Sequence, residues 1–255
     1  MKRCIALLLL VATTASAGEL RNAAHDAKAL ATAPLHWHAH QWQRLGEGAA
    51  AVVLVGALDK PIDDFIQRNR SSFTNSFAKH VTPFGGGRAL QISAVMFAGG
   101  ALFHDHRLEG AGRDALISEL WAAGLVTPLI KRAVGRARPF VGEGSHSFRP
   151  EQAHADEYQS FPSGHATNAF AAATAIAAHY HGVVPAIAYT LATGVAFSRV
   201  NDHVHWPSDV LAGALIGRAV AKGVTFGHTH VNITFSIISA HSAARGLSRS
   251  SRSPR

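Results

Sequence analysis

Six apolar segments of helical length dominate the middle of this chain, and they restrict its fold more than any other feature. They are rich in Ala, Leu and Gly, and they show little of the alternation of β-branched residues that marks strands. The segments cover residues 49–58, 89–103, 115–130, 166–178, 183–197 and 210–220. Turn-forming stretches separate them, for example Gly85-Gly86-Gly87. The pattern predicts an all-α bundle, built as one domain over residues 48–230.

The length of these segments bears on whether the bundle spans a membrane. None of them reaches the roughly 18 uninterrupted apolar residues that a membrane span requires. Asp114 and Glu119 interrupt one, and the stretch from His179 to His181 ends another. The mean hydropathy of +0.09 is also low for a bundle of membrane helices. Small residues still allow close helix packing in a bilayer, so peripheral or partial membrane insertion is left open.

The first 17 residues have the form of a secretory signal peptide. Lys2 and Arg3 are followed by an apolar run over residues 5–12 and by the small residues Ala15-Ser16-Ala17. A buried N-terminal helix is the alternative. Cys4 is the single cysteine, and cleavage after Ala17 would leave none in the mature chain. We therefore expect secretion to a bacterial periplasm, with membrane association left open, and a fold without disulfides.

Polar segments flank the predicted domain on both sides. Residues 18–47 read as an irregular arm in which His36, His38 and His40 alternate, as they would on one face of a strand. Because no carboxylate or cysteine accompanies them, we interpret them as packing residues and not as a metal site. Residues 231–255 read as a C-terminal extension that ends in a disordered basic tail.

The charge of the chain favours an anionic partner. Lys and Arg number 24 against 16 Asp and Glu, which gives +8. Such a balance suits nucleic acid, a membrane surface or a phosphorylated ligand. The predicted signal peptide and the arginines of the tail account for most of the excess. No broad nucleic-acid surface is therefore expected.

The first of three chemically informative clusters runs from Lys131 to Pro139. Two helical turns would bring Lys131 and Arg138 to nearly the same face, with the helix ending near Arg138 because Pro139 follows. A flexible ammonium and a planar guanidinium could then converge on one anion. Arg132 and Arg136 are expected to face away, toward ion pairs or solvent. Alone, the cluster is more typical of a solvated basic helix face.

The second cluster is Phe161-Pro162-Ser163-Gly164-His165, directly before an apolar segment. Ser163 is a favourable N-cap, and Gly164 has no side chain to obstruct a ligand. Free backbone N–H groups in the first turn would face an anion, and His165 would project from the same turn. Alone, the cluster is an ordinary turn into a helix.

The third cluster runs from Ser198 to Asp209 and includes Arg199. Pro207 suits the first turn of a helix, which would place Asp209 in that turn and close to His205. Asp209 could accept one ring N–H of His205 and leave the other nitrogen free as a nucleophile. A purely structural His–Asp pair is the alternative. His203 is a further candidate for lining a pocket.

In chain order the clusters read KxxxxxxRP, PSGH and SRxxxxxHxxxD, and every position of this three-part pattern is matched. The chain therefore resembles the type 2 phosphatidic acid phosphatase superfamily, which includes bacterial acid phosphatases, lipid phosphate phosphatases and vanadium haloperoxidases. The resemblance extends over residues 115–222. It implies an all-α helical bundle of the acid phosphatase/haloperoxidase type.

The resemblance also implies a role for each matched residue. His205 would attack phosphorus and form a phosphohistidine, Asp209 would orient it, and His165 would protonate the leaving oxygen. The phosphoryl oxygens would be bound by Lys131, Arg138, Ser163, Gly164 and Arg199. Three cations and backbone donors can neutralise and position a phosphoryl group without a metal or another cofactor.

The predicted function is metal-independent hydrolysis of phosphate monoesters or lipid (di)phosphates through a phosphohistidine. The partner would be a phosphorylated small molecule or a lipid phosphate, with the polar loop 140–160 shaping access. A vanadium haloperoxidase and a membrane-associated lipid phosphate phosphatase are the alternatives. A non-enzymatic module for anions or nucleic acid is least favoured, because binding alone does not require both His165 and His205.

Overall fold

The structure is a computed structural model that describes residues 32–225. The helices are, in chain order, η1 (Ala33–His36), α3 (Ala39–Gly56), α4 (Asp59–Arg68), α5 (Ser72–Val81), η2 (Thr82–Gly85), α6 (Gly87–Phe103), α7 (His106–Glu119), the π-helix η3 (Leu120–Val126), α8 (Thr127–Val134), η4 (Pro139–Val141), η5 (Pro150–Gln152), η6 (Asp156–Tyr158), α9 (Gly164–His179) and α10 (Val183–Asn201). A last helix covers residues 207–225. Within the described range the secondary structure is helical apart from turns and one isolated bridge between Arg136 and Phe148, so the all-α prediction is confirmed.

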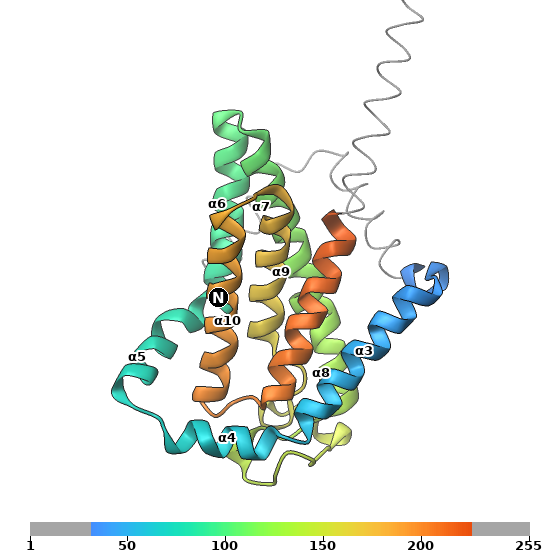
Figure 1. Cartoon of the computed structure of the whole chain (residues 1–255), viewed down its shortest axis with the longest axis vertical. Coiled ribbons are helices and arrows are strands. Elements are labelled where there is room, and N and C mark those ends of the chain that lie inside the picture. The colour runs from blue at the N-terminus through green and yellow to red at the C-terminus, as the bar shows by residue number, and fades with distance from the viewer. Residues whose placement is uncertain (1–31, 226–255) are drawn as a thin grey trace, which may run out of the picture.

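Helix α9 lies at the centre of the bundle, with α7, α10 and the helix 207–225 around it (Figure 1). Helix α6 packs on α7, and α5 packs on α10. Helix α4 crosses below the bundle at the end where α10 finishes, and α3 runs obliquely beside the bundle, nearest to it at its own α4 end. Helices α7, α8 and α10 run toward α4, while α9 and the last helix run away from it (Figure 1). The C-terminal ends of α8 and α10 and the N-terminal ends of α9 and the last helix therefore lie together near α4.

Glycine allows the helix 207–225 to approach α9 at backbone distance. A Cβ atom at Gly213 would lie 2.5 Å from the carbonyl oxygen of Ser163, and one at Gly217 would overlap the carbonyl oxygen of Thr167. One layer further along, Ala115, Ala175 and Ala221 form a buried cluster. Small residues thus fill the centre of the bundle, as they do where helices pack closely in membranes.

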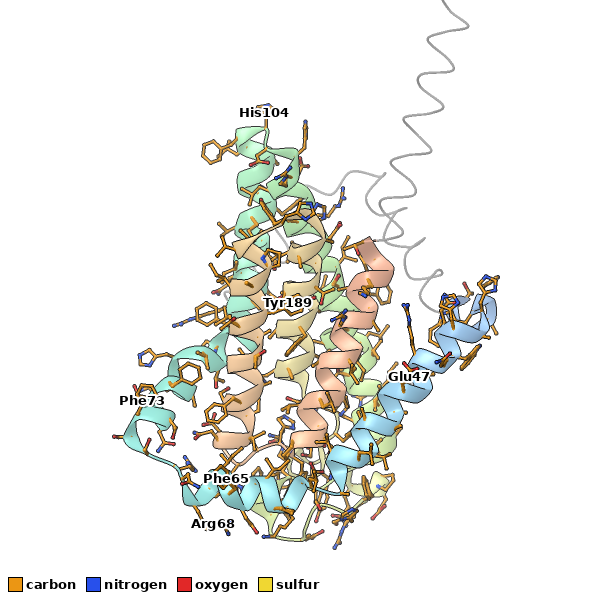
Figure 2. The ribbon with its side chains drawn as sticks, viewed as in Figure 1. Glu47, Phe65, Arg68, Phe73, His104 and Tyr189 are labelled. Atoms are coloured by element: carbon orange, nitrogen blue, oxygen red, sulfur yellow. The ribbon has the colours of Figure 1, made fainter. Side chains whose placement is uncertain are left out.

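Many of the large apolar side chains are exposed on the outside of the bundle. Figure 2 shows Phe65 and Phe73 at the periphery, on α4 and α5. Other exposed apolar side chains include Leu54, Val95, Leu102, Phe103 and Ile187. An apolar exterior around a small-residue interior suits a lipid environment better than water.

Helix α10 is long and apolar enough to cross a membrane, which corrects the expectation that no segment is. The apolar run ends at Phe197, but the helix continues to Asn201, and the single cation Arg199 lies in its last turn. Only 28% of its most apolar window is buried, whereas the core helix of a water-soluble protein would be mostly buried. Helix α6 is also apolar but shorter.

Two parts of the sequence organisation differ from expectation or fall outside the described range. Residues 39–47, assigned to the irregular arm, form the first half of α3, and His36 and His40 lie in helices and not on a strand. No group of three metal-binding side chains occurs among residues 32–225. The predicted signal peptide and the C-terminal extension from residue 231 lie outside the described residues.

Candidate functional site

The predicted site residues gather at the α4 end of the bundle, because the helices that carry them begin or end there. They are placed as follows: Lys131 in the last turn of α8, Arg138 in the segment after it, Ser163 as the N-cap of α9 with Gly164 and His165 in its first turn, Arg199 in the last turn of α10, His205 in the following loop and Asp209 in the first turn of the last helix. Lys131, Arg138 and Arg199 all lie close enough to His165 to lower its pKa. The structure thus brings the three clusters together.

The route by which Arg138 reaches the site differs from the prediction. Helix α8 ends at Val134, and Gly135 follows with φ +59°. Gly135 takes this left-handed conformation readily, and a Cβ there would overlap the carbonyl group of Arg149 in a loop packed against it. Arg138 therefore follows an extended stretch and does not share a helix face with Lys131.

The loop 140–160 packs against the two cations of the first cluster. Arg138 pairs with the Asp156 carboxylate at 2.6 Å and donates to the Asp156 carbonyl at 2.8 Å. The Lys131 ammonium donates to the carbonyl oxygen of Gln159. Burial, reinforced by the charge of Arg138, lowers the pKa of Lys131 to about 8. The loop therefore holds both cations in place. The lowered pKa means that the Lys131 ammonium begins to lose its proton just above neutral pH.

The turn before α9 is tied to the turn that carries Asp209. The N–H of Ser163 donates to the Asp209 carbonyl at 3.0 Å, while the Ser163 hydroxyl accepts from the Ala166 N–H at 3.5 Å. His165 lies against the Gly85-Gly86 backbone, where a Cβ at Gly86 would be 3.4 Å from the ring Nε2. Close contact with these glycines fixes one side of the ring.

Both candidate catalytic histidines are neutral near pH 7. Burial, together with the three site cations, lowers the pKa of His165 to about 4. Burial also lowers the pKa of His205 to about 3, against the opposing charge of Asp209. A neutral ring suits His205 as a nucleophile. His165 can serve as an acid only once a bound anion offsets the cations and raises its pKa.

The His205–Asp209 pair is closer to a contact than to the predicted hydrogen bond. The His205 Nδ1 is 3.7 Å from the nearer Asp209 oxygen and, within the described range, makes no hydrogen bond. The carboxylate instead accepts from the Trp206 N–H at 2.8 Å and from the Ser160 hydroxyl. Burial alone would raise the pKa of Asp209, but His205, Arg136 and Ser160 outweigh it and hold that pKa below its usual value. Asp209 is thus a preorganised carboxylate beside His205.

Arg136 is the main residue whose importance the sequence did not reveal. It is buried, and its guanidinium pairs with Asp209 and Asp59 at 2.6 Å each. It also donates to the Ser145 carbonyl. The chain leaves helical geometry at Gly135, so Arg136 and Arg138 are directed by separate loop contacts. Arg136 does form ion pairs, as expected, but it reaches them from the segment after α8 and not from a continuous helix face.

The remaining candidates have partners of their own. Arg199 donates to Asp202 at 3.1 Å and to the Thr82 hydroxyl at 3.3 Å. His203 lies 3.1 Å from Asp63 on α4. Of these, Arg199 lowers the pKa of His165 and belongs with the site, whereas His203 faces α4.

Comparison with known proteins identifies relatives of the segment that carries the site. The family model of the PAP2 superfamily matches residues 115–244. The chain is 43% identical over 100 residues to a lipid A 1-phosphatase of Rhizobium etli, covering 37% of this chain and 41% of that protein. It is 29% identical over 154 residues to a probable lipid phosphate phosphatase 4 of Arabidopsis thaliana, covering 49% and 47%. The alignments span less than half the length of these relatives.

A solved structure shares the fold. It is the crystal structure of a transmembrane PAP2 type phosphatidylglycerolphosphate phosphatase from Bacillus subtilis, with a TM-score of 0.56 and 22% identity. The match covers 72% of this chain and 96% of that one. The helical bundle is therefore that of PAP2 phosphatases, as the sequence predicted.

Proposed function

Because this chain belongs to the PAP2 superfamily, we propose that it is a phosphoric ester hydrolase that acts on a lipid phosphate at the membrane. The observation that carries the proposal is the combination of two features in one molecule. Three cations and two neutral histidines gather at one end of the bundle, and the sides of that bundle are apolar. Relatives named as lipid phosphatases support the same conclusion.

The lengths of the apolar helices support a membrane location. Helix α6 has 17 residues and α10 has 19, which correspond to about 26 and 28 Å. The hydrocarbon core of a bilayer is about 30 Å thick. Charged side chains on these helices lie near the site end, with Arg88 in the first turn of α6 and Arg199 in the last turn of α10. The site would then lie where lipid headgroups lie, and the predicted signal peptide favours the periplasmic face.

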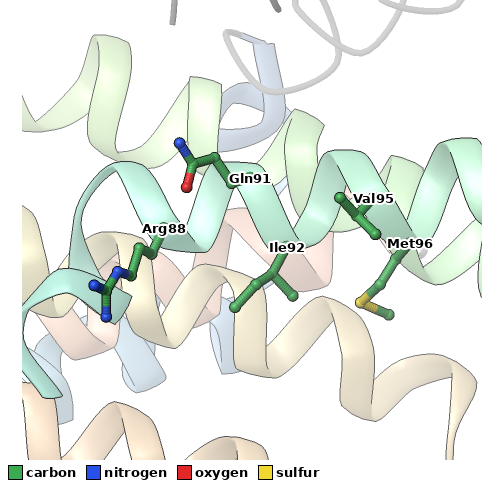
Figure 3. Close-up of a pocket in the computed structure, with 5 residues that line it drawn as sticks. All are labelled: Arg88, Gln91, Ile92, Val95 and Met96. Atoms are coloured by element: carbon green, nitrogen blue, oxygen red, sulfur yellow. The ribbon is translucent and has the colours of Figure 1, made fainter. Parts of the chain in front are cut away.

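The surface of α6 offers room for acyl chains beside the site. Arg88, Gln91, Ile92, Val95 and Met96 line a shallow hollow that follows this helix (Figure 3). Its lining is mainly apolar, and it begins two residues after Gly86, which borders His165. A lipid whose phosphate occupied the site could lay its chains along this surface.

The proposed reaction uses the protein's own side chains. Lys131, Arg138 and Arg199 bind the phosphoryl oxygens, and the neutral His205 attacks phosphorus. The negative charge of the substrate raises the pKa of His165, which then protonates the leaving oxygen and later assists the attacking water. Asp209 stabilises the positive charge that the phosphorylated ring of His205 acquires. Charge neutralisation and positioning supply most of the catalysis that phosphoryl transfer requires.

The proposal predicts a preference for lipid substrates without a requirement for metal. In detergent micelles, the full chain should release phosphate from a long-chain phosphatidic acid or a lipid A phosphate at least about tenfold faster, in kcat/KM, than from a soluble aryl phosphate. EDTA should leave the rate unchanged. Phosphate release measured over a substrate panel checks this. Equal rates on the soluble ester would contradict the lipid assignment, and loss of activity on chelation would contradict the mechanism.

The pKa of Lys131 predicts an alkaline limit to catalysis. Its ammonium binds phosphate only when protonated, so kcat/KM should fall as pH rises through about 8. Lys131→Arg keeps the charge to higher pH, so its alkaline limb should move upward by at least about one pH unit. Rate profiles between about pH 6 and 10 measure both limbs. An unchanged limb in the variant would assign the titration to another group.

A further inference from the structure

Asp59 lies on α4, outside the segment that the family model matches. It nevertheless contacts Arg136 and Ser208, the residues beside Asp209. Its side chain is fully buried. It accepts hydrogen bonds from the Ser208 N–H at 2.8 Å and the Ser208 hydroxyl at 2.6 Å. Asp59 thus caps the helix whose first turn carries Asp209.

The second contact of Asp59 joins it to the catalytic pair. The Arg136 guanidinium donates through Nη2 to Asp59 and through Nη1 to Asp209, at 2.6 Å each. Arg136 is 4% exposed, so solvent does not screen these charges strongly. Two carboxylates share one cation, so the group formed by Asp59, Arg136 and Asp209 has a net negative charge.

That net charge lies beside His205. The nearer Asp209 oxygen is 3.7 Å from His205 Nδ1. If Arg136 had Asp209 as its single carboxylate partner, it would neutralise that carboxylate. Because Asp59 occupies the other side of the guanidinium, part of the Asp209 charge remains available to the histidine ring.

We propose that Asp59 is a positioning residue for the phosphatase reaction, acting on Asp209 through Arg136. The proposal rests on the proposed function. In the first step His205 Nε2 forms a bond to phosphorus, the ester P–O bond breaks, and the leaving oxygen takes the electron pair and a proton from His165. The phosphorylated ring, which keeps its Nδ1–H, is positively charged. The charge that Asp59 adds to the cluster stabilises this ring.

The test compares Asp59→Asn with Asp59→Glu in the full chain in detergent micelles. Asp59→Asn keeps the shape of the side chain and one acceptor oxygen, but it removes the charge and the second acceptor oxygen. Asp63→Asn is the matched control, because Asp63 is a buried carboxylate on the same helix that pairs with His203 and not with Arg136. Binding of orthovanadate counts the intact sites, and kcat is expressed per site.

We expect Asp59→Asn to lower kcat per site at least tenfold while KM for the lipid phosphate stays within twofold. Phosphate binding depends on cations that Asp59 does not touch, so KM should be insensitive. Asp59→Glu should recover part of the loss because it restores the charge. Asp63→Asn should match the wild type per site.

A structural role for Asp59 would give a different result. Asp59→Asn would then reduce the number of vanadate-binding sites with kcat per site unchanged, and that result would overturn the inference. So would a Glu variant as impaired per site as the Asn variant. Because kcat is counted per intact site, a poorly folding variant still gives an answer. A wild-type protein without phosphatase activity would instead overturn the proposed function itself.

Discussion

Replacement of His205 by Ala is expected to lower phosphatase turnover by at least about a thousandfold, because no other side chain can take over the attack on phosphorus. The ring is neutral and buried, so its lone pair is available at pH 7. The cations that bind phosphate would remain in place. Vanadate binding that persisted without turnover would be the signature of a lost nucleophile.

The same substitution should leave the protein folded. His205 Nδ1 makes no hydrogen bond within the described range, and Asp209 keeps its contacts with Arg136 and the Trp206 N–H. The thermal unfolding transition in detergent measures this. His203→Gln is the matched control, since it changes a neighbouring histidine that faces α4 and should retain wild-type turnover. Substantial turnover by purified His205→Ala protein would contradict the nucleophile assignment.

The parts of the site that could be predicted are those fixed by local chain geometry. Ser163 caps α9, and Pro207 lies at the start of the last helix, as residues of their types commonly do. These two turns bring His165, His205 and Asp209 to helix ends, and helices of a bundle that alternate in direction bring such ends together. The all-α fold followed from the spacing of the apolar segments in the same way.

The parts that could not be predicted depend on contacts between distant segments. Arg136 and Asp59 are 77 residues apart, and neither belongs to a spacing that helical periodicity explains. The prediction that Arg138 shares a helix face with Lys131 was wrong, because α8 ends before Gly135. Gly135 has a positive φ and lies so close to the Arg149 carbonyl that a side chain would not fit there. A buried ion pair is visible only when the fold has brought both partners together.

The apolar exterior was hidden from the sequence for a related reason. Composition counts apolar residues without stating which of them face outward. Here most of the buried apolar positions are Ala, while side chains such as Phe103 and Ile187 are exposed. The mean hydropathy of the whole chain therefore underestimated how apolar the surface of the bundle is.

Gly217→Ala should have the second large effect, because it separates the two helices that carry the catalytic groups. A Cβ at Gly217 would overlap the carbonyl oxygen of Thr167 and lie 2.9 Å from the Ala171 nitrogen. Neither backbone atom can move away without shifting α9. Overpacking of this kind costs about 1–3 kcal/mol of folding free energy, which outweighs the gain of about 1 kcal/mol from replacing Gly with Ala in a helix.

The effect on catalysis should exceed the effect on stability. The Ser163 N–H donates to the Asp209 carbonyl. Displacement of α9 would break this bond and carry Ser163 and His165 away from the turn that holds Asp209. A misplacement of about 1 Å can lower a rate about a hundredfold, so we expect a loss of kcat of this order. Gly46→Ala is the matched control, because Gly46 lies on α3, where an added Cβ would meet no atom within 4 Å, and the change should leave kcat intact. If Gly217→Ala kept full activity, the close helix contact would not be what sets the distance between His165 and His205.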